Sequence, residues 1–369
     1  MKFSLLALLF MVALGINTAS ALPRFASRTG AKCQSCHVNP SGGGMRQTFG
    51  VQYGRDELPV PTWMEEYNID DFSTQITEML SVGADFRTLF FYRQLPDTGS
   101  NTAGSLNAFW EMQGDMYLNF KLAKKINIYL DKGLYSGFEI FGTAAILPAN
   151  GYIKVGKFVP NYGMKMDDHT LFVREATGFS SERGRTELTG AEVAISPGVA
   201  TVAGGIYNAT DGFGAGTGSK KAVLGRAEGI FKVADNMFVG VGGNVFSTSR
   251  SGNVQTTLYG GFGSFSFENL TVLSEVDFID VDNAGTKQKG FVSYLEANYV
   301  VIPGVDLKIA YDFLDRDTEV KSGSVSRYSF GFEFFPIAGI ELRPMYRIMK
   351  EDPTELKNDE FHFLIHFYL

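Results

Sequence analysis

Apolar and polar residues alternate along most of the chain from residue 77 onward. In residues 328–335, YSFGFEFF, aromatic side chains recur on one face, while serine, glycine and glutamate fall on the other. A period of two predicts β-strands, because successive side chains of a strand point to opposite faces. Residues 107–120 and 306–313 alternate in the same way. A soluble β-sandwich also alternates, so this pattern predicts strands without fixing what they face.

The connections between these strands alternate between short and long. Outer-membrane barrels have tight periplasmic turns and longer external loops. Short turns lie at residues 196–198, 234–236, 268–269, 302–304 and 336–339, and longer polar loops at 209–220, 248–253, 281–288, 314–324 and 351–358. If short and long connections alternate strictly along the chain, the sequence predicts sixteen strands. They lie near residues 77–93, 106–122, 125–131, 135–146, 151–160, 187–196, 200–208, 221–233, 237–247, 254–267, 270–280, 289–301, 305–315, 325–335, 340–350 and 359–369.

The C-terminal stretch FHFLIHFYL carries an unbroken apolar face that runs to the last residue, Leu369. It resembles the terminal strand of bacterial outer-membrane proteins, except that such strands usually end on an aromatic residue. A closed barrel is the one strand-built structure that satisfies every backbone group in lipid. We therefore expect an all-β fold, a transmembrane antiparallel β-barrel of about 16 strands in the outer-membrane lipid of a Gram-negative cell.

The N-terminal stretch MKFSLLALLFMVALGINTASA has the form of a secretory signal peptide. Lys2 precedes an apolar run over residues 3–14, and Ala19-Ser20-Ala21 matches a cleavage site. The apolar run is too short for a membrane anchor. We expect three parts: a signal peptide at residues 1–21, a short periplasmic segment or plug at residues 22–70, and the barrel at residues 71–369.

The composition and the motifs of the chain argue against several classes of function. Lysine and arginine number 33 against 40 aspartate and glutamate residues, a net charge of −7 with no basic cluster, so nucleic acid is not an expected partner. Two cysteines cannot form a disulfide scaffold. The sequence contains no Ser/His/Asp order typical of hydrolases and no phosphate-binding loop, and we do not expect an enzyme.

Those two cysteines stand in the motif Cys33-x-x-Cys36-His37. The motif matches the attachment signature of c-type haem, in which both thiols form thioethers and the histidine is the proximal iron ligand. A thioredoxin-like redox pair would need a βαβ context, which the flanking residues lack. A short-loop disulfide would leave the histidine without a role, and a zinc site would need further ligands. Export favours haem, so the sequence predicts one haem c.

Residues 24–50, RFASRTGAKCQSCHVNPSGGGMRQTFG, resemble the N-terminal segment of a family of monohaem c-type cytochrome or porin-like outer-membrane β-barrels of Gram-negative bacteria. Residues 156–170, GKFVPNYGMKMDDHT, resemble a strand-to-loop element of specific porins. The resemblance implies a haem-bearing barrel in the outer membrane and leaves the substrate open.

A c-type haem also needs a sixth iron ligand or an open site. His366 is the first candidate, because strand parity turns it into the lumen near the periplasmic end of the last strand. His362 shares that face, and Met45 and Met64 could supply sulfur. His169 lies in the longest loop, residues 161–186, which often folds inward in porins. There, Asp167-Asp168-His169 could form a constriction, a metal-type cluster or a haem contact. The alternatives are an ordinary polar wall and a solvated loop.

The expected function is electron transfer at the outer membrane, with one haem held at or inside the periplasmic mouth. One haem cannot bridge a hydrocarbon core of about 25–30 Å, so periplasmic or extracellular cytochromes are expected partners. The alternative is a porin-like solute channel whose N-terminal segment is a plug and whose haem is structural or sensory. A haem enzyme such as a peroxidase would need an acid–base group that nothing in the sequence marks.

Overall fold

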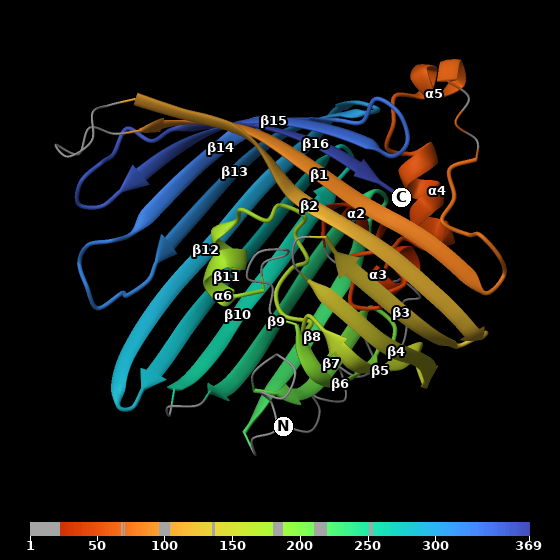
Figure 1. The fold of residues 1–369 in the computed structure, drawn as a ribbon, viewed down its shortest axis with the longest axis horizontal. Coiled ribbons are helices and arrows are strands. Elements are labelled where there is room, and N and C mark those ends of the chain that lie inside the picture. Colours follow the sequence, from red (N-terminus) through yellow and green to blue (C-terminus); the bar gives the residue numbers. More distant parts are fainter. Residues whose placement is uncertain are drawn as a thin grey trace.

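Sixteen strands close into one antiparallel barrel, in which every strand pairs with its neighbours in sequence and β1 closes on β16 (Figure 1). The computed structural model describes residues 23–67, 69, 71–95, 104–134, 137–179, 187–209, 220–250 and 254–369. The predicted fold class and strand number are confirmed. The predicted signal peptide lies outside the described residues.

Most strand bounds agree closely with the predicted ones. The strands are β1 (Leu80–Leu95), β2 (Gly104–Ala123), β3 (Ile126–Gly133), β4 (Phe138–Leu147), β5 (Gly151–Phe158), β6 (Leu188–Ile195), β7 (Ala200–Asn208), β8 (Lys221–Ala234), β9 (Met237–Arg250), β10 (Val254–Phe267), β11 (Leu270–Asn283), β12 (Thr286–Ile302), β13 (Val305–Asp315), β14 (Val325–Phe334), β15 (Ile340–Glu351) and β16 (Glu360–Tyr368).

One predicted connection is wrong. Residues 281–288 were expected to form a longer loop, but β11 runs on to Asn283 and β12 begins at Thr286. The turn between them consists of Ala284 and Gly285, both with positive φ, 51° and 98°. Two such residues form the tight turn that matches the twist of paired strands. Beyond the lipid, the ends of β11 and β12 are polar on both faces. The alternation of apolar and polar residues that predicts a strand is therefore lost there.

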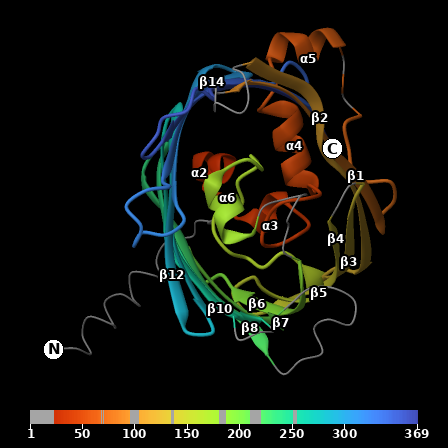
Figure 2. The same ribbon diagram turned by 60° about the vertical axis from the view of Figure 1, so that its left-hand side comes forward.

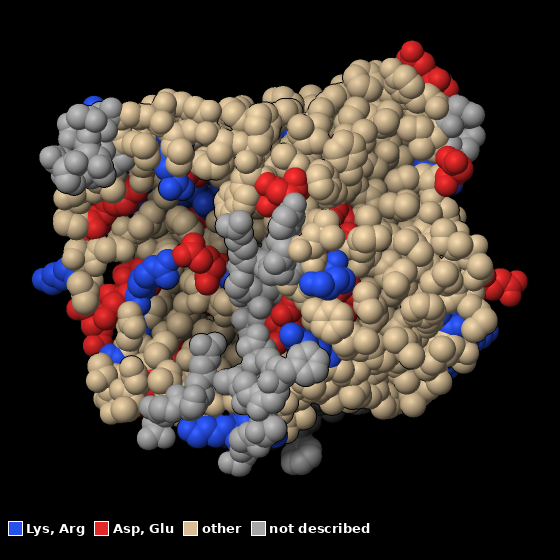
Figure 3. Space-filling view, viewed as in Figure 1, with Lys and Arg blue, Asp and Glu red and all other residues tan. Residues whose placement is uncertain are grey.

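Apolar side chains face outward and polar side chains face the lumen. On β13, Leu307 and Ile309 are exposed, whereas Lys308 between them is buried. On β16, Phe361 and Phe367 are exposed, whereas His362 and His366 are buried inside. Figure 3 shows charged side chains gathered in the hollow of the barrel, while the outer wall over β1 and β2 is mostly uncharged. This apolar exterior and polar interior place the barrel in the outer membrane of a Gram-negative cell.

The N-terminal segment lies inside one end of the barrel. Its helices are α2 (Arg24–Thr29), α3 (Cys33–Cys36), α4 (Thr48–Asp56) and α5 (Pro61–Tyr67). Figure 2 shows α2, α3 and α4 within the barrel and α5 at its rim. We call residues 23–58 the plug. No helix among the described residues is long and apolar enough to span a membrane.

The plug occupies the end of the barrel that carries the short turns. Lys32 donates hydrogen bonds to the carbonyl oxygens of Ser196 and Gly198 in the β6–β7 turn, at 3.1 and 3.3 Å. Val60, just past the plug, donates from its backbone N–H to the carbonyl oxygen of Phe335 in the β14–β15 turn, at 3.0 Å. Short turns are periplasmic in barrels of this kind. The N-terminal segment therefore lies in the lumen at the periplasmic end, as predicted.

A substitution on the outward face of β16 tests directly which side chains of this strand face lipid. Phe367 is 46% exposed and packs against Phe86, with ring centroids 6.4 Å apart. Phe367→Asp should slow barrel assembly, because it places a carboxylate on the lipid-facing belt. The equilibrium cost near the membrane interface is under about 1 kcal/mol, so assembly is the more sensitive readout. Phe367→Leu is the control. Gel mobility of unboiled protein reports the folded fraction, and equal fractions for both variants would contradict the assigned face.

Candidate functional site

The two cysteines and the adjacent histidine lie on one helical turn inside the barrel. α3 spans Cys33–Cys36, and the backbone N–H of His37 donates to the carbonyl oxygen of Cys33 at 2.9 Å. Side chains three residues apart on a helix point to the same side. Cys33, Cys36 and His37 all line one lumen cavity of about 290 Å³. The sequence motif is therefore part of the wall of an internal cavity.

His37 is held in the orientation that suits a metal ligand. Its Nδ1 lies 3.2 Å from the carbonyl oxygen of Gly44, so Nδ1–H donates there and Nε2 keeps its lone pair. Metal-binding histidines in general donate their second ring N–H in this way. Burial, together with the positive charge of Arg46, lowers the pKa of His37 to about 4. The imidazole is therefore neutral near pH 7, as ligation requires.

Three glycines turn the chain back beside His37. Gly42, Gly43 and Gly44 have φ values of 91°, 80° and 64°, a region that side chains disfavour. They allow His37 to pair with Arg46 as an antiparallel bridge. A Cβ on Gly44 would lie 2.2 Å from the hydroxyl oxygen of Tyr129. The Gly-Gly-Gly run in the sequence therefore fixes the support of His37.

The cysteines lack the environment of a redox-active pair. Burial raises the pKa of Cys33 to about 12 and also raises that of Cys36. Reactive cysteines instead have a lowered pKa, because the thiolate is the nucleophile. Cys33 and Cys36 are not joined by a disulfide. The structure thus disfavours the thioredoxin-like alternative and leaves both thiols facing the cavity.

Buried N–H donors without acceptors line the same cavity. Nη1 of Arg46, Nε of Arg87 and Nδ1 of His169 are buried and have no hydrogen-bond partner in the described part of the chain. A buried donor without a partner costs about 1–3 kcal/mol. Guanidinium groups form their strongest hydrogen bonds with carboxylates and phosphates. The residues present fit a haem, whose two carboxylates would accept from these donors.

Of the predicted sixth ligands, His169 and His366 line this cavity. His366 is engaged at both ring nitrogens, with Nε2 2.5 Å from Asp85 Oδ1 and Nδ1 2.8 Å from Glu341 Oε2. His169 has one partner, Arg87, whose Nη1 lies 2.9 Å from Nε2. The structure thus brings two of the candidates to the wall that His37 shares.

The other three candidates lie elsewhere. Nε2 of His362 is 2.9 Å from Glu360. Met45 is fully buried in an apolar cluster of the lumen, and Met64 on α5 accepts a hydrogen bond from the backbone N–H of Ala338. Met166 does line the cavity, and sequence reasoning missed it. Nothing local marks Met166, because only the fold of its loop brings it there.

That loop folds inward, as the sequence suggested. We call residues 159–179, which include α6 (Phe172–Thr177), the inward loop. Asp167 pairs with Arg343 at 3.1 Å, and Asp168 with Arg347 at 2.8 Å. Asp167 is only partly buried, which would raise its pKa slightly, but the positive charge of Arg343 outweighs this effect and holds the pKa below its usual range. For the described residues of this loop the alternative of a solvated loop is wrong, because Asp167, Asp168 and His169 contact arginines of the lumen wall.

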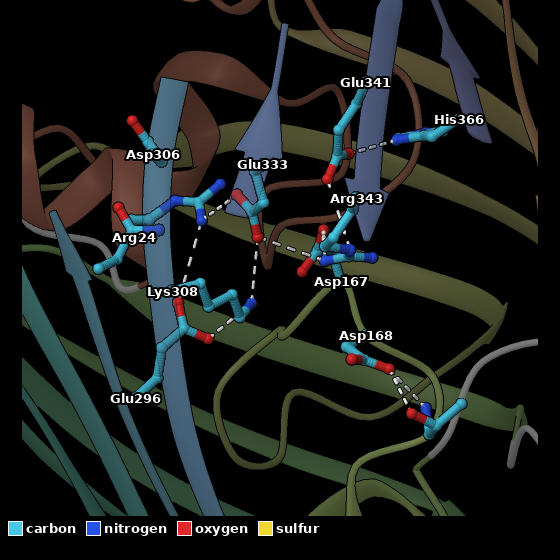
Figure 4. Close-up of polar contacts among 12 residues, drawn as sticks. Arg24, Asp167, Asp168, Glu296, Asp306, Lys308, Glu333, Glu341, Arg343 and His366 are labelled. Atoms are coloured by element: carbon cyan, nitrogen blue, oxygen red, sulfur yellow. Dashed lines mark hydrogen bonds and ion pairs between the residues drawn. The ribbon is translucent and has the colours of Figure 1, made fainter. Parts of the chain in front are cut away.

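A network of buried charges ties the plug to the barrel wall (Figure 4). Arg24 of the plug pairs with Glu333 on β14 and lies 4.0 Å from Glu296 on β12. Lys308 bridges the same two carboxylates at 2.8 and 3.2 Å. Arg343, the partner of the inward loop, lies 3.6 Å from Glu333. The plug and the inward loop are therefore held by one network.

A second anchor lies on the far side of the plug. Lys154 on β5 is fully buried, with Nζ 3.1 Å from Glu192. The same Nζ donates to the hydroxyl oxygen of Ser41 in the plug at 2.8 Å. Burying a charge is costly unless it is paired and hydrogen-bonded, so this site is stable only while its partners stay in place. Two opposite walls of the barrel thus hold the plug.

Comparisons with known proteins identify the fold class. No known family model matches the chain, and no curated protein matches it. The solved structures it resembles include OmpT, an outer membrane protein of Vibrio cholerae, with TM-score 0.58, 11% identity, and coverage of 79% of this chain and 100% of that chain. An anion-selective porin from Comamonas acidovorans has TM-score 0.58, 12% identity, and 79% and 99% coverage. The outer membrane channel DcaP of Acinetobacter baumannii has TM-score 0.55, 11% identity, and 80% and 100% coverage.

At these identities the likeness shows the fold alone. The chain has the fold of porin-like outer-membrane β-barrels, which confirms the barrel half of the expected resemblance. The comparisons do not support the cytochrome half. The case for haem therefore depends on the plug and its cavity.

Proposed function

We propose that this porin-like barrel holds one haem c on its plug and transfers electrons at the outer membrane. The observation that carries the proposal is that Cys33, Cys36 and His37 line one lumen cavity, with Nδ1 of His37 bonded to the carbonyl oxygen of Gly44. When bound, haem c supplies one iron that gains or loses a single electron at a time.

Residues of the plug and of the barrel wall would together bind the haem. Cys33 and Cys36 would form the two thioether bonds, and His37 would bind the iron. Arg46 and Arg87 have buried donors without acceptors at the same cavity and would neutralise the two carboxylates. The barrel would exclude lipid from the site, and periplasmic or extracellular cytochromes would complete a path that one haem cannot span.

The anchored plug favours electron transfer over solute flow. The helices of the plug lie across the lumen, with buried ion pairs to β14 and β12 on one side and a hydrogen bond from Lys154 on the other. The inward loop fills space beside it through the pairs of Asp167 and Asp168. Small ion conductance is therefore expected for the wild-type protein in planar bilayers.

A solute channel with a structural or sensory haem is the second candidate. It is favoured by the likeness in fold to proteins described as an anion-selective porin and an outer membrane channel. In that case the plug would be a gate rather than a fixed holder. A large open-channel conductance of the wild-type protein, together with a haem that no redox protein can reduce or oxidise, would favour this candidate.

If the iron binds a second protein ligand, we expect His169 rather than His366 to supply it. To bind iron, His366 would give up a charge-assisted bond to a buried carboxylate with either nitrogen. Such bonds contribute about 1.5–3 kcal/mol. His169 would give up one bond to Arg87 at most.

His169→Leu should therefore turn the ferric haem high-spin or shift its reduction potential, while His366→Leu leaves the spectrum unchanged. His362→Leu is the matched control, because His362 is paired with Glu360 away from the cavity. Absorption spectra of the oxidised and reduced variants provide the measurement. If only His366→Leu changed the spectrum, His366 would be the second ligand, as expected from the sequence.

A further inference from the structure

A second cavity opens at the short-turn end of the barrel. It has a volume of about 650 Å³ and lies between the plug and strands β2, β3 and β4. Lys121, Lys124 and Lys125 line it together with Arg46, and Glu78 is the one carboxylate that the described residues contribute to its lining. We call this cavity the vestibule. Its positive lining contrasts with the net charge of −7 of the whole chain.

The three lysines are free to meet a partner. All three are exposed, and none forms an ion pair with the described residues. Lys121 follows Asn119 on the lumen face of β2, whereas Phe120 and Leu122 beside it face lipid. Lys124 and Lys125 form the β2–β3 turn. The three charges thus lie together at one edge of the barrel mouth rather than on its lipid-facing belt.

The vestibule reaches the back of the haem-attachment motif. His37 and Arg46 are the only described residues that line both the vestibule and the cavity of Cys33 and Cys36. These two residues pair as an antiparallel bridge, so one layer of the plug separates the two spaces. A molecule that binds at the vestibule would therefore contact His37, the residue that would bind the iron.

We propose that the vestibule is the docking site for a small acidic electron-transfer protein of the periplasm. A cleft lined by one sign of charge focuses its field and steers partners of the opposite sign. The partner would exchange one electron with the haem c of the plug, so that one centre is oxidised as the other is reduced and no atom is transferred. This inference depends on the proposed function.

The test reverses the three charges in the full-length protein. K121E/K124E/K125E is compared with K287E/K321E/K357E, which changes the net charge equally through exposed lysines at the opposite, long-loop end. An acidic flavodoxin and a basic mitochondrial-type cytochrome c are the probes. Equilibrium binding and the second-order rate of electron exchange are measured at about 10 mM and about 1 M salt, where the Debye length is about 30 Å and about 3 Å.

The vestibule variant should bind the acidic probe at least about 10-fold more weakly at low salt and exchange electrons correspondingly slowly. The difference should vanish at high salt, and the control variant should behave as the wild type. Equal behaviour of the two variants would overturn the proposal, as would a wild-type preference for the basic probe. A loss of binding to anionic phospholipid vesicles, with unchanged flavodoxin exchange, would assign the lysines to lipid and also overturn it.

The same samples separate this inference from the proposed function. Haem content and the absorption spectrum should be identical in the wild type and both variants, because the lysines lie outside the cavity of the thiols. Full haem content with no vestibule effect overturns the docking site alone. Absence of covalent haem in all three proteins overturns the proposed function, whatever the binding data show.

Discussion

Replacing Cys33 and Cys36 together by serine should abolish covalent haem, while the barrel still assembles. The thiols are the only sulfur atoms that can form thioethers in this chain, and both face the lumen cavity. Serine keeps the size of each side chain, and α3 makes no ion pair that this change would break within the described residues. The wild type, expressed with c-type maturation machinery, should carry one covalent haem per chain.

Haem staining after denaturing electrophoresis provides the measurement, and the faster mobility of unboiled protein shows that each variant is folded. His37→Ala serves as a second variant that should keep the covalent bond but lose the normal spectrum. A wild-type protein without covalent haem, produced beside a c-type cytochrome that matures normally, would contradict the account. Staining that survives the double serine change would assign the haem to another site.

Arg24→Met should release the plug and raise the ion conductance of the barrel several-fold. The side chain of Arg24 is 9% exposed and pairs with Glu333, which is fully buried. Removing one partner of a buried pair costs about 3–5 kcal/mol, because it leaves the other charge uncompensated. Lys308 stays near Glu333, so the effect should fall at the lower end of that range. The loss affects the docking of the plug rather than the strands.

Arg55→Met is the matched control. Arg55 lies in α4 of the same plug but pairs with its exposed neighbour Asp56. Surface pairs of this kind contribute little, so the conductance should stay as in the wild type. Single-channel recordings in planar bilayers provide the measurement. If Arg24→Met and Arg55→Met conduct equally little, the buried network does not hold the plug in the lumen.

The barrel could be predicted from the sequence because residues that face lipid and residues that face the lumen alternate along each strand. Phe367 and His366 show this well, since neighbours on β16 face lipid and lumen as parity required. Parity fails where both faces of a strand meet water, as at Asn283 and Thr286, which are polar and were assigned to a loop. The predicted number of strands was still correct, because the connection between β11 and β12 was placed at the right position and only its length was wrong.

The thiols and His37 could be predicted because their chemistry is local to five residues. The rest of the site could not, because it depends on contacts between distant parts of the chain. Arg24 meets Glu333, and His169 meets Arg87, only after the barrel has closed and the inward loop has folded. The orphaned donors of the cavity carry no signal in sequence, since an arginine at a lumen position is ordinary in a wide barrel.

The most direct test of the account is the position of iron in the full-length protein matured with haem. Anomalous scattering at the iron edge from crystals of that protein would locate the metal without assumptions about its ligands. The account predicts a single iron inside the lumen, bound by Nε2 of His37, in the cavity that Cys33 and Cys36 line. Iron outside the barrel, or a plug without iron in protein that was exposed to maturation, would contradict it.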